Sequence, residues 1–198
     1  TKQTKSHIGT TENERGIMNN SDLRVYAKAI RFCITAHGDQ KRKYTGTPYW
    51  HHPVNVSNIL IDSGISNIDM VCAAILHDTV EDTEATLRDI QDEFGLEIAD
   101  LVSWLTDVSV LEDGNRAARK KLDREHTALA PAAAQTIKLA DLIDNSESIL
   151  KHDPKFAKVY MAEKKLLLEV LTKGAPVLMA RAKAIVDDYF NNQVNKTH

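Results

Sequence analysis

The feature that most restricts how this chain can fold is an apolar stretch that ends in two ionisable residues. From Ile68 to Leu76, apolar side chains occupy nearly every side of an expected helix, and His77 and Asp78 follow directly. A helix that is apolar all round is buried in the centre of a protein. An imidazole and a carboxylate are costly to bury at its end unless something compensates them, and a divalent cation would compensate both. The chain must therefore surround this helix and neutralise one end of it.

The rest of the chain also predicts helices joined by short loops. It has only 8 glycines and 5 prolines, and few alternating runs of β-branched residues that would indicate a sheet. We expect Ser21 to cap the first helix, Pro53 to begin the second and Thr86 to cap another. Apolar spacing places the helices around the central one at about residues 21–37, 53–62, 86–94, 96–105, 116–129, 132–150, 154–171 and 177–190. The predicted fold class is all-α, a single-domain helical bundle with a central metal site.

Length and charge limit the domain organisation and the partners. The 198 residues suit one domain, predicted at 21–190 between a polar, disordered leader at 1–20 and a polar tail at 191–198. The net charge of −3 gives no reason to expect a nucleic acid polymer or a membrane as partner. No apolar run approaches the roughly 20 residues of a membrane span, so a cytoplasmic location is expected. The cysteines, Cys33 and Cys72, lie in apolar patterns and are expected to be buried free thiols.

Two acidic residues, Glu81 and Asp82, follow one turn after the ionisable pair. If the chain stays helical, Glu81 lies over His77 and Asp82 lies over Asp78. Metal-assisted hydrolysis requires ligands together with nearby acids that orient water or move protons. The alternative is a polar helix end followed by a solvated acidic loop. The apolar run before the four residues favours a site.

A second candidate lies in the apolar helix predicted at residues 132–150. Asp141 follows Lys138 there, and Asn145 comes one turn later. Asp141 either binds a metal or forms a salt bridge inside the bundle, and its local pattern leaves both possibilities open.

Histidines and basic residues before the second predicted helix are further candidates. His51 and His52 stand directly before Pro53, where a histidine taken alone is more often a capping or surface residue. His37, at the end of the first helix, is interpreted as structural. The basic stretch from Lys41 to Lys43 would, by itself, most often be a solvated loop.

These motifs, in this order, resemble a known family. Residues 40–53, 73–83 and 138–145 are similar to the hydrolase domain of RelA/SpoT-type alarmone enzymes, which belongs to the HD superfamily. The likeness is greatest to the small stand-alone alarmone hydrolases, including the metazoan SpoT homologues. Order and spacing agree from about Tyr26 to Leu150. The resemblance implies a helical bundle of the HD-domain type.

The resemblance also implies roles for particular residues. The residues that match the metal ligands of the family are His52, His77, Asp78 and Asp141. Those that match its catalytic acids and its amide are Glu81, Asp82 and Asn145. Those that match its substrate contacts are Arg42, Lys43 and Tyr160. The resemblance, not the spacing, selects His52 over His37 and His51.

The activity implied is metal-dependent phosphohydrolysis of a small anionic nucleotide. Similar enzymes use Mn²⁺ and remove the 3′-pyrophosphate from guanosine 3′,5′-bis(diphosphate)-type alarmones, which gives GDP or GTP and pyrophosphate. The expected cofactor is therefore a divalent ion, Mn²⁺, although the ligand types also suit Fe²⁺, Co²⁺ or Zn²⁺.

Three positions depart from the pattern of those enzymes. The family usually has a basic residue, a His or Tyr, and an Arg where this chain has Leu142, Asp144 and Glu147. A glutamate in place of an arginine would weaken the binding of a polyanion if it touched phosphate. Two alternatives therefore stay open: a phosphohydrolase for another nucleotide or a phosphorylated dinucleotide, and a non-catalytic nucleotide-binding module. A metal-free structural bundle is a third.

Overall fold

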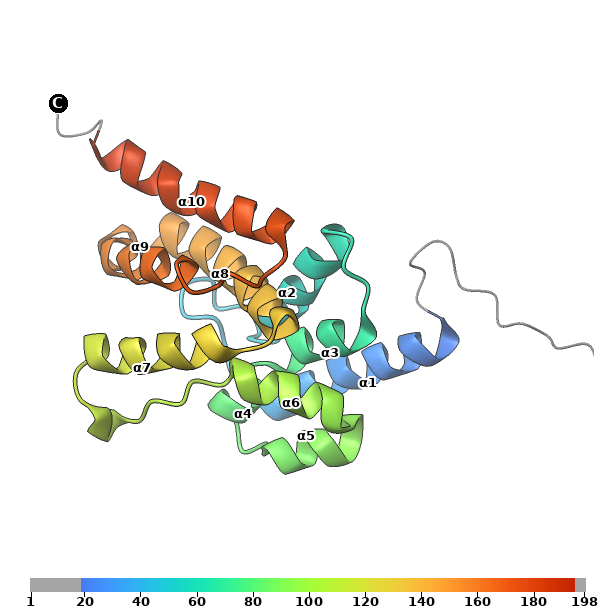
Figure 1. Cartoon of the computed structure of the whole chain (residues 1–198). Coiled ribbons are helices and arrows are strands. Elements are labelled where there is room, and N and C mark those ends of the chain that lie inside the picture. Colours follow the sequence, from blue (N-terminus) through green and yellow to red (C-terminus); the bar gives the residue numbers. More distant parts are fainter. Residues whose placement is uncertain (1–18, 195–198) are drawn as a thin grey trace, which may run out of the picture.

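The described part of the chain is a bundle of helices. The computed structural model describes residues 19–194, and within this range there are no strands, only one isolated bridge between Lys41 and Pro48 (Figure 1). The helices are α1 (Asn20–His37), α2 (His51–Asp62), α3 (Ile68–Leu76), α4 (Thr79–Asp82), α5 (Leu87–Phe94), α6 (Leu96–Leu105), the 3₁₀ turn η1 (Leu111–Asp113), α7 (Arg116–Leu129), α8 (Ala132–His152), α9 (Pro154–Leu168) and α10 (Pro176–Val194). The all-α prediction is confirmed.

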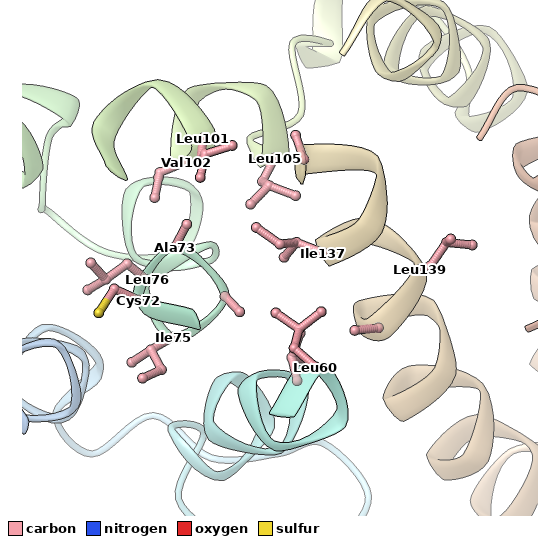
Figure 2. Packing of buried hydrophobic residues seen from close by; sticks show 14 of the residues in the cluster. Leu60, Cys72, Ala73, Ile75, Leu76, Leu101, Val102, Leu105, Ile137 and Leu139 are labelled. Carbon is pink, nitrogen blue, oxygen red and sulfur yellow. The ribbon is translucent and has the colours of Figure 1, made fainter. Parts of the chain in front are cut away.

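Helix α3 is the centre of the larger hydrophobic core. It packs against α1, α2, α6 and α8, and its residues from Val71 to Leu76 are fully buried. Figure 2 shows Leu60 of α2, Val102 of α6 and Ile137 of α8 around it. The uniform apolar character of this stretch is explained by having neighbours on every side. The end of α3 therefore lies inside the molecule.

Helix α8 joins the two hydrophobic cores. One of its faces packs on α2, α3 and α6, and it also packs on α9 and α10 (Figure 1). A second, smaller cluster on that side contains Ile149, Ala157, Met161 and Val186. Because α8 has neighbours on several sides, a polar residue on its α2 side is held inside the bundle.

Two helix starts differ from the prediction. Asn19, not Ser21, caps α1, because the Asn19 side chain accepts hydrogen bonds from the backbone amides of Ser21 and Asp22. Helix α2 begins at His51, two residues before the predicted start at Pro53. A proline is tolerated throughout the first turn, where its missing N–H has no partner in the helix, so it does not define the first residue.

The predicted ends of the chain agree with the structure only in part. Helix α10 continues to Val194, so residues 191–194 of the predicted polar tail are helical. Residues 1–18 of the predicted leader lie outside the described residues, whereas its last two residues, Asn19 and Asn20, cap and begin α1. The thiols of Cys33 and Cys72 are free and buried as expected, and burial raises the pKa of each to about 12. Between residues 19 and 194, no helix combines the length and apolar character needed to cross a membrane.

Candidate metal centre

Three distant segments bring the predicted metal ligands together. His52 lies in the first turn of α2, His77 and Asp78 connect α3 to α4, and Asp141 lies in the middle of α8. One ligand atom from each of His52, His77 and Asp78 lies within 4.8 Å of the others.

Asp141 completes the group from the opposite helix. Its Oδ1 is 3.2 Å from His52 Nε2 and 3.7 Å from His77 Nε2. We call these four residues the four-residue centre.

Hydrogen bonds decide which nitrogen of each histidine faces the centre. His77 Nδ1 is 2.8 Å from the carbonyl oxygen of Ala74, and His52 Nδ1 is 2.6 Å from Asp144 Oδ2. Carbonyl and carboxylate oxygens accept hydrogen bonds, so both Nδ1 atoms carry the proton. In the neutral rings, both Nε2 atoms then present lone pairs to the carboxylates. The buried Nε2 of His77 has no hydrogen-bond partner among the described residues.

The charges of the four-residue centre favour a cation. Burial alone would lower the pKa of His52 and His77, but the nearby carboxylates raise both above the usual value. Burial alone would raise the pKa of Asp78 and Asp141, but the histidines and, at Asp141, the Lys138 ammonium lower both. The carboxylates therefore stabilise a positive charge that lies between them and the histidines.

The donor set fits a divalent first-row metal ion. Two imidazole nitrogens and two carboxylate oxygens suit Mn²⁺, Fe²⁺, Co²⁺ or Zn²⁺. Two carboxylates carry a charge of −2, which one dication neutralises. An orphaned, buried lone pair such as His77 Nε2 is the structural sign of a group that lacks its natural partner. His52, His77, Asp78 and Asp141 could therefore hold such an ion.

Neighbouring side chains hold the carboxylates in place. Tyr49 Oη donates to Asp78 Oδ2 at 2.8 Å, and Asn145 Nδ2 donates to Asp141 Oδ1 at 2.7 Å. Lys138 Nζ lies 3.3 Å from the other oxygen of Asp141. The sequence did not single out Tyr49, since an aromatic residue after a proline in a loop carries no signal of such a contact. Burial and then Asp78 raise the pKa of Tyr49.

The predicted catalytic acids lie at the edge of the centre. Glu81 and Asp82 are exposed on α4, and Asp82 N still donates to Asp78 O at 2.9 Å, so the helical spacing continues past the end of α3. Glu81 Oε2 accepts from the backbone amide of Asp107 at 3.2 Å. Loss of solvation and then the Asp107 carboxylate raise the pKa of Glu81. A raised pKa suits a group that takes a proton during a reaction.

The three predicted substrate contacts lie at different depths. Arg42 reaches the centre, where its NH1 donates to Asn145 Oδ1 at 3.2 Å. Lys43 is exposed, with Nζ 5.0 Å from the centre of the Tyr44 ring. Tyr160 is buried in the smaller core, and its hydroxyl has no hydrogen-bond partner between residues 19 and 194. The structure therefore brings Arg42 to the centre and leaves Lys43 outside it.

The departures from the alarmone enzymes have three different environments. Leu142 is buried in the larger core, and Asp144 contacts His52. Glu147 pairs with Arg181 of α10 at 2.8 Å, so its negative charge already has a partner.

The two histidines that the resemblance did not select lie elsewhere. His51 is exposed, and its ring stacks on Trp50 with 4.1 Å between centroids. His37 is buried, and its Nδ1 lies 2.8 Å from Gln40 Oε1, which agrees with a structural role.

Comparison with known families defines the class of this protein. Residues 29–167 match the HD domain family. The chain therefore belongs to the HD domain family, and the resemblance noted in the sequence is confirmed.

Several relatives within this class carry one name, guanosine-3′,5′-bis(diphosphate) 3′-pyrophosphohydrolase MESH1. The protein of that name from Danio rerio is 34% identical over 139 residues, which cover 69% of this chain and 76% of the relative. The protein of that name from Homo sapiens is 37% identical over 136 residues, covering 68% and 74% of the two chains.

A solved structure has the same architecture. It is described as a metazoan orthologue of SpoT that hydrolyses ppGpp, and it aligns with a TM-score of 0.76 and 29% identity over 83% of this chain and 95% of its own. A protein from Listeria monocytogenes EGD-e aligns with a TM-score of 0.59 and 26% identity over 72% of this chain and 98% of its own.

Proposed function

We propose that this protein is a metal-dependent hydrolase that removes the 3′-pyrophosphate from guanosine 3′,5′-bis(diphosphate)-type alarmones. The observation that carries the proposal is the convergence of two imidazole Nε2 atoms and two carboxylates in one largely buried place. The names of the MESH1 relatives support the choice of substrate. We take Mn²⁺ as the ion, with His52, His77, Asp78 and Asp141 as its ligands.

In this proposal, residues of the chain perform the binding and the proton transfer. A divalent ion supplies Lewis acidity and lowers the pKa of a water molecule. Glu81, with Asp82 beside it, orients the attacking water and accepts its proton, because both lie one turn beyond the ligands His77 and Asp78. The hydroxyl group goes to phosphorus, the bond from phosphorus to the 3′ oxygen breaks, and the 3′ oxygen takes up a proton.

Further residues bind and orient the alarmone. Arg42 binds phosphate oxygens, since a guanidinium can contact two of them at once, and the exposed Lys43 adds a positive charge outside the centre. Asn145 connects this arginine to the centre, because its amide bonds both Arg42 and Asp141. Tyr160 stays a predicted substrate contact, and its hydroxyl is buried in the smaller core.

Replacement of Asp78 tests the proposed activity. We expect Asp78→Ala to lower pyrophosphate release from alarmones in the presence of Mn²⁺ by about a thousandfold or more, because one ligand and its charge are lost. Asp187→Ala is the matched control, since Asp187 is an exposed aspartate of α10 that pairs with Lys183. A folded Asp78→Ala protein that kept more than a few per cent of the wild-type rate would contradict the proposal.

A second candidate is the hydrolysis of a different phosphorylated nucleotide or dinucleotide. The observation that favours it is the ion pair between Arg42 and Asp144, with 3.4 Å between NH2 and Oδ2, which offsets the charge of the proposed phosphate-binding arginine. A panel of alarmones, common nucleotides and phosphorylated dinucleotides, assayed with Mn²⁺, separates the two candidates by their kcat/KM values. The panel also tests the non-catalytic alternative, which requires that no substrate turns over.

The cytoplasmic location of the protein stays a prediction.

A further inference from the structure

Asp144 lies next to the four-residue centre, and it contacts one member of the centre, His52, and the neighbouring Arg42. Its Oδ2 is 2.6 Å from His52 Nδ1 and 3.4 Å from Arg42 NH2. Asp141 and Asp144 are three residues apart on α8 and so lie on the same face of the helix. The helix therefore offers a carboxylate to each nitrogen of the His52 ring, Asp141 to Nε2 and Asp144 to Nδ1.

We propose that Asp144 is a positioning residue, which fixes the ring and the tautomer of His52 for metal binding and holds Arg42 beside the centre. The proposal rests on the proposed metal site and deepens it. A metal-binding histidine commonly donates its other N–H to a carboxylate, which orients the ring and makes the ligand nitrogen more basic. The His52 side chain is only 1% exposed, so no water competes freely for that N–H.

The two histidines of the centre are oriented by different means. His77 donates to the backbone oxygen of Ala74 in its own helix, three residues earlier, so its orientation follows from the local chain. His52 depends on Asp144, which lies 92 residues away in the sequence. The orientation of His52 therefore depends on how α8 packs against α2. A substitution of Asp144 alone can test this dependence.

Charge balance explains why Asp144 is paired with an arginine. The ligands Asp78 and Asp141 neutralise one dication, so a third carboxylate beside them would leave a net negative charge where an anionic substrate must bind. The Arg42 guanidinium offsets the charge of Asp144, and both side chains are largely buried, 16% and 15% exposed. The pair of Asp144 and Arg42 thus adds an oriented acceptor without adding net charge.

Metal affinity, measured without substrate, tests the role of Asp144. We expect Asp144→Ala to weaken Mn²⁺ binding by about 10- to 100-fold in a titration followed by the signal of free Mn²⁺. Asp144→Asn keeps an oxygen that accepts from Nδ1 and should restore most of the affinity, to within about tenfold of wild type. Glu147→Ala, a change on the same helix at a residue paired with Arg181, is the control and should bind Mn²⁺ as wild type does.

A second readout follows the His52 tautomer in the metal-free protein at alkaline pH, where the ring is neutral. The ¹⁵N shifts of the ring should report a proton on Nδ1 in the wild type and in Asp144→Asn. They should report a changed tautomer population in Asp144→Ala. If Asp144→Ala does not fold, the KM of Asp144→Asn for the alarmone tests the proposal instead. Loss of the ionic contact to Arg42 should change KM for the alarmone more than kcat, and an unchanged KM would overturn the proposal.

The outcomes separate this proposal from the proposed function. Wild-type Mn²⁺ affinity and an unchanged tautomer in folded Asp144→Ala would refute the role of Asp144 and leave alarmone hydrolysis intact. The expected order of affinities in a protein that hydrolyses no alarmone would refute the proposed substrate and leave the role of Asp144 standing.

Discussion

Two clusters of charged residues in this molecule differ in how their charges are satisfied. In the ion-pair cluster, formed by Asp107, Ser109, Lys120 and Asp123, Lys120 Nζ contacts both aspartates. Ser109 donates to Asp123 from its backbone amide at 3.0 Å and from its hydroxyl at 3.1 Å. In the four-residue centre, by contrast, two imidazole Nε2 atoms and two carboxylates face one another, and His77 Nε2 has no hydrogen-bond partner among the described residues.

The comparison shows how a structural ion pair differs from a candidate binding site. The donors and acceptors of the ion-pair cluster match, so the cluster holds the loop after α6 against α7 without an additional group. The four-residue centre has an excess of acceptors, which is costly in a buried place unless a cation is shared among them. Partial burial of charged residues is common to both, and only the balance of donors and acceptors distinguishes them.

Removal of divalent cations should separate the two clusters most clearly. Chelation should abolish hydrolysis and lower stability, because an ion at a hundredfold excess over its Kd contributes about 2.7 kcal/mol. For a chain of this length, that corresponds to a Tm lower by roughly 5–11 °C in a thermal scan with and without Mn²⁺. The Tm of Asp78→Ala should not respond to Mn²⁺. An equal response of the two proteins would mean that the ion binds elsewhere.

Asp123→Asn should give the opposite result, a loss of stability without a loss of activity. At pH 7 we expect the free energy of unfolding to fall by about 1.5–3 kcal/mol, because hydrogen bonds to a charged group are lost. Hydrolysis should stay within about threefold of wild type, since the carboxylate of Asp123 contacts Ser109 and Lys120 and no residue of the proposed site. Urea unfolding and a turnover assay on the same preparation measure both.

The pH dependence of the same variant sharpens this test. Burial alone would raise the pKa of Asp123, but the Ser109 amide and the Lys120 ammonium lower it below the usual value. The ionised carboxylate therefore stabilises the fold above the unfolded pKa of about 3.9, and this contribution is lost as the pH falls through the lower folded pKa. The gap between wild type and Asp123→Asn should be constant from pH 7 to 5 and narrow below about pH 4. A constant gap at all pH values would show that the charge does not matter.

Glu147→Gln should have the smallest effect. Glu147 pairs with Arg181, and both side chains are about half exposed, so the pair contributes only about 0–1 kcal/mol. We expect kcat/KM for the alarmone to stay within about twofold of wild type, because the substituted charge already has a partner in α10. A clear rise in kcat/KM would show instead that Glu147 repels the substrate.

Local sequence patterns were sufficient to predict most of the helices. The apolar spacing predicted α6 and α7 with the bounds that the structure shows, and Thr86 caps α5 with Asp89 as its capping-box partner. Caps and turns act within a few residues of the chain, so the sequence displays them directly. The prediction was wrong where two neighbouring residues could each serve as the start, as at Asn19 and Ser21.

Local sequence patterns predicted less of the candidate site than of the helices. Spacing could not choose among His37, His51 and His52, because which histidine faces α3 and α8 depends on how α1 and α2 pack. Only the resemblance selected His52, and the structure places its ring beside Asp141. Tyr49 lies in the stretch that resembles the family, but nothing in the sequence assigned it a role, since its partner Asp78 is distant in the chain.

The sequence by itself determined the buried helix from Ile68 to Leu76, the polar residues that end it, and the helical class of the chain, because these depend on local apolar spacing. Only the tertiary structure decided that Asp144 contacts His52 and that Glu147 faces Arg181. Both are contacts between helices that are distant in the sequence. Their partners follow from the packing of α2, α8 and α10, which no rule reaching three or four residues along a helix can supply.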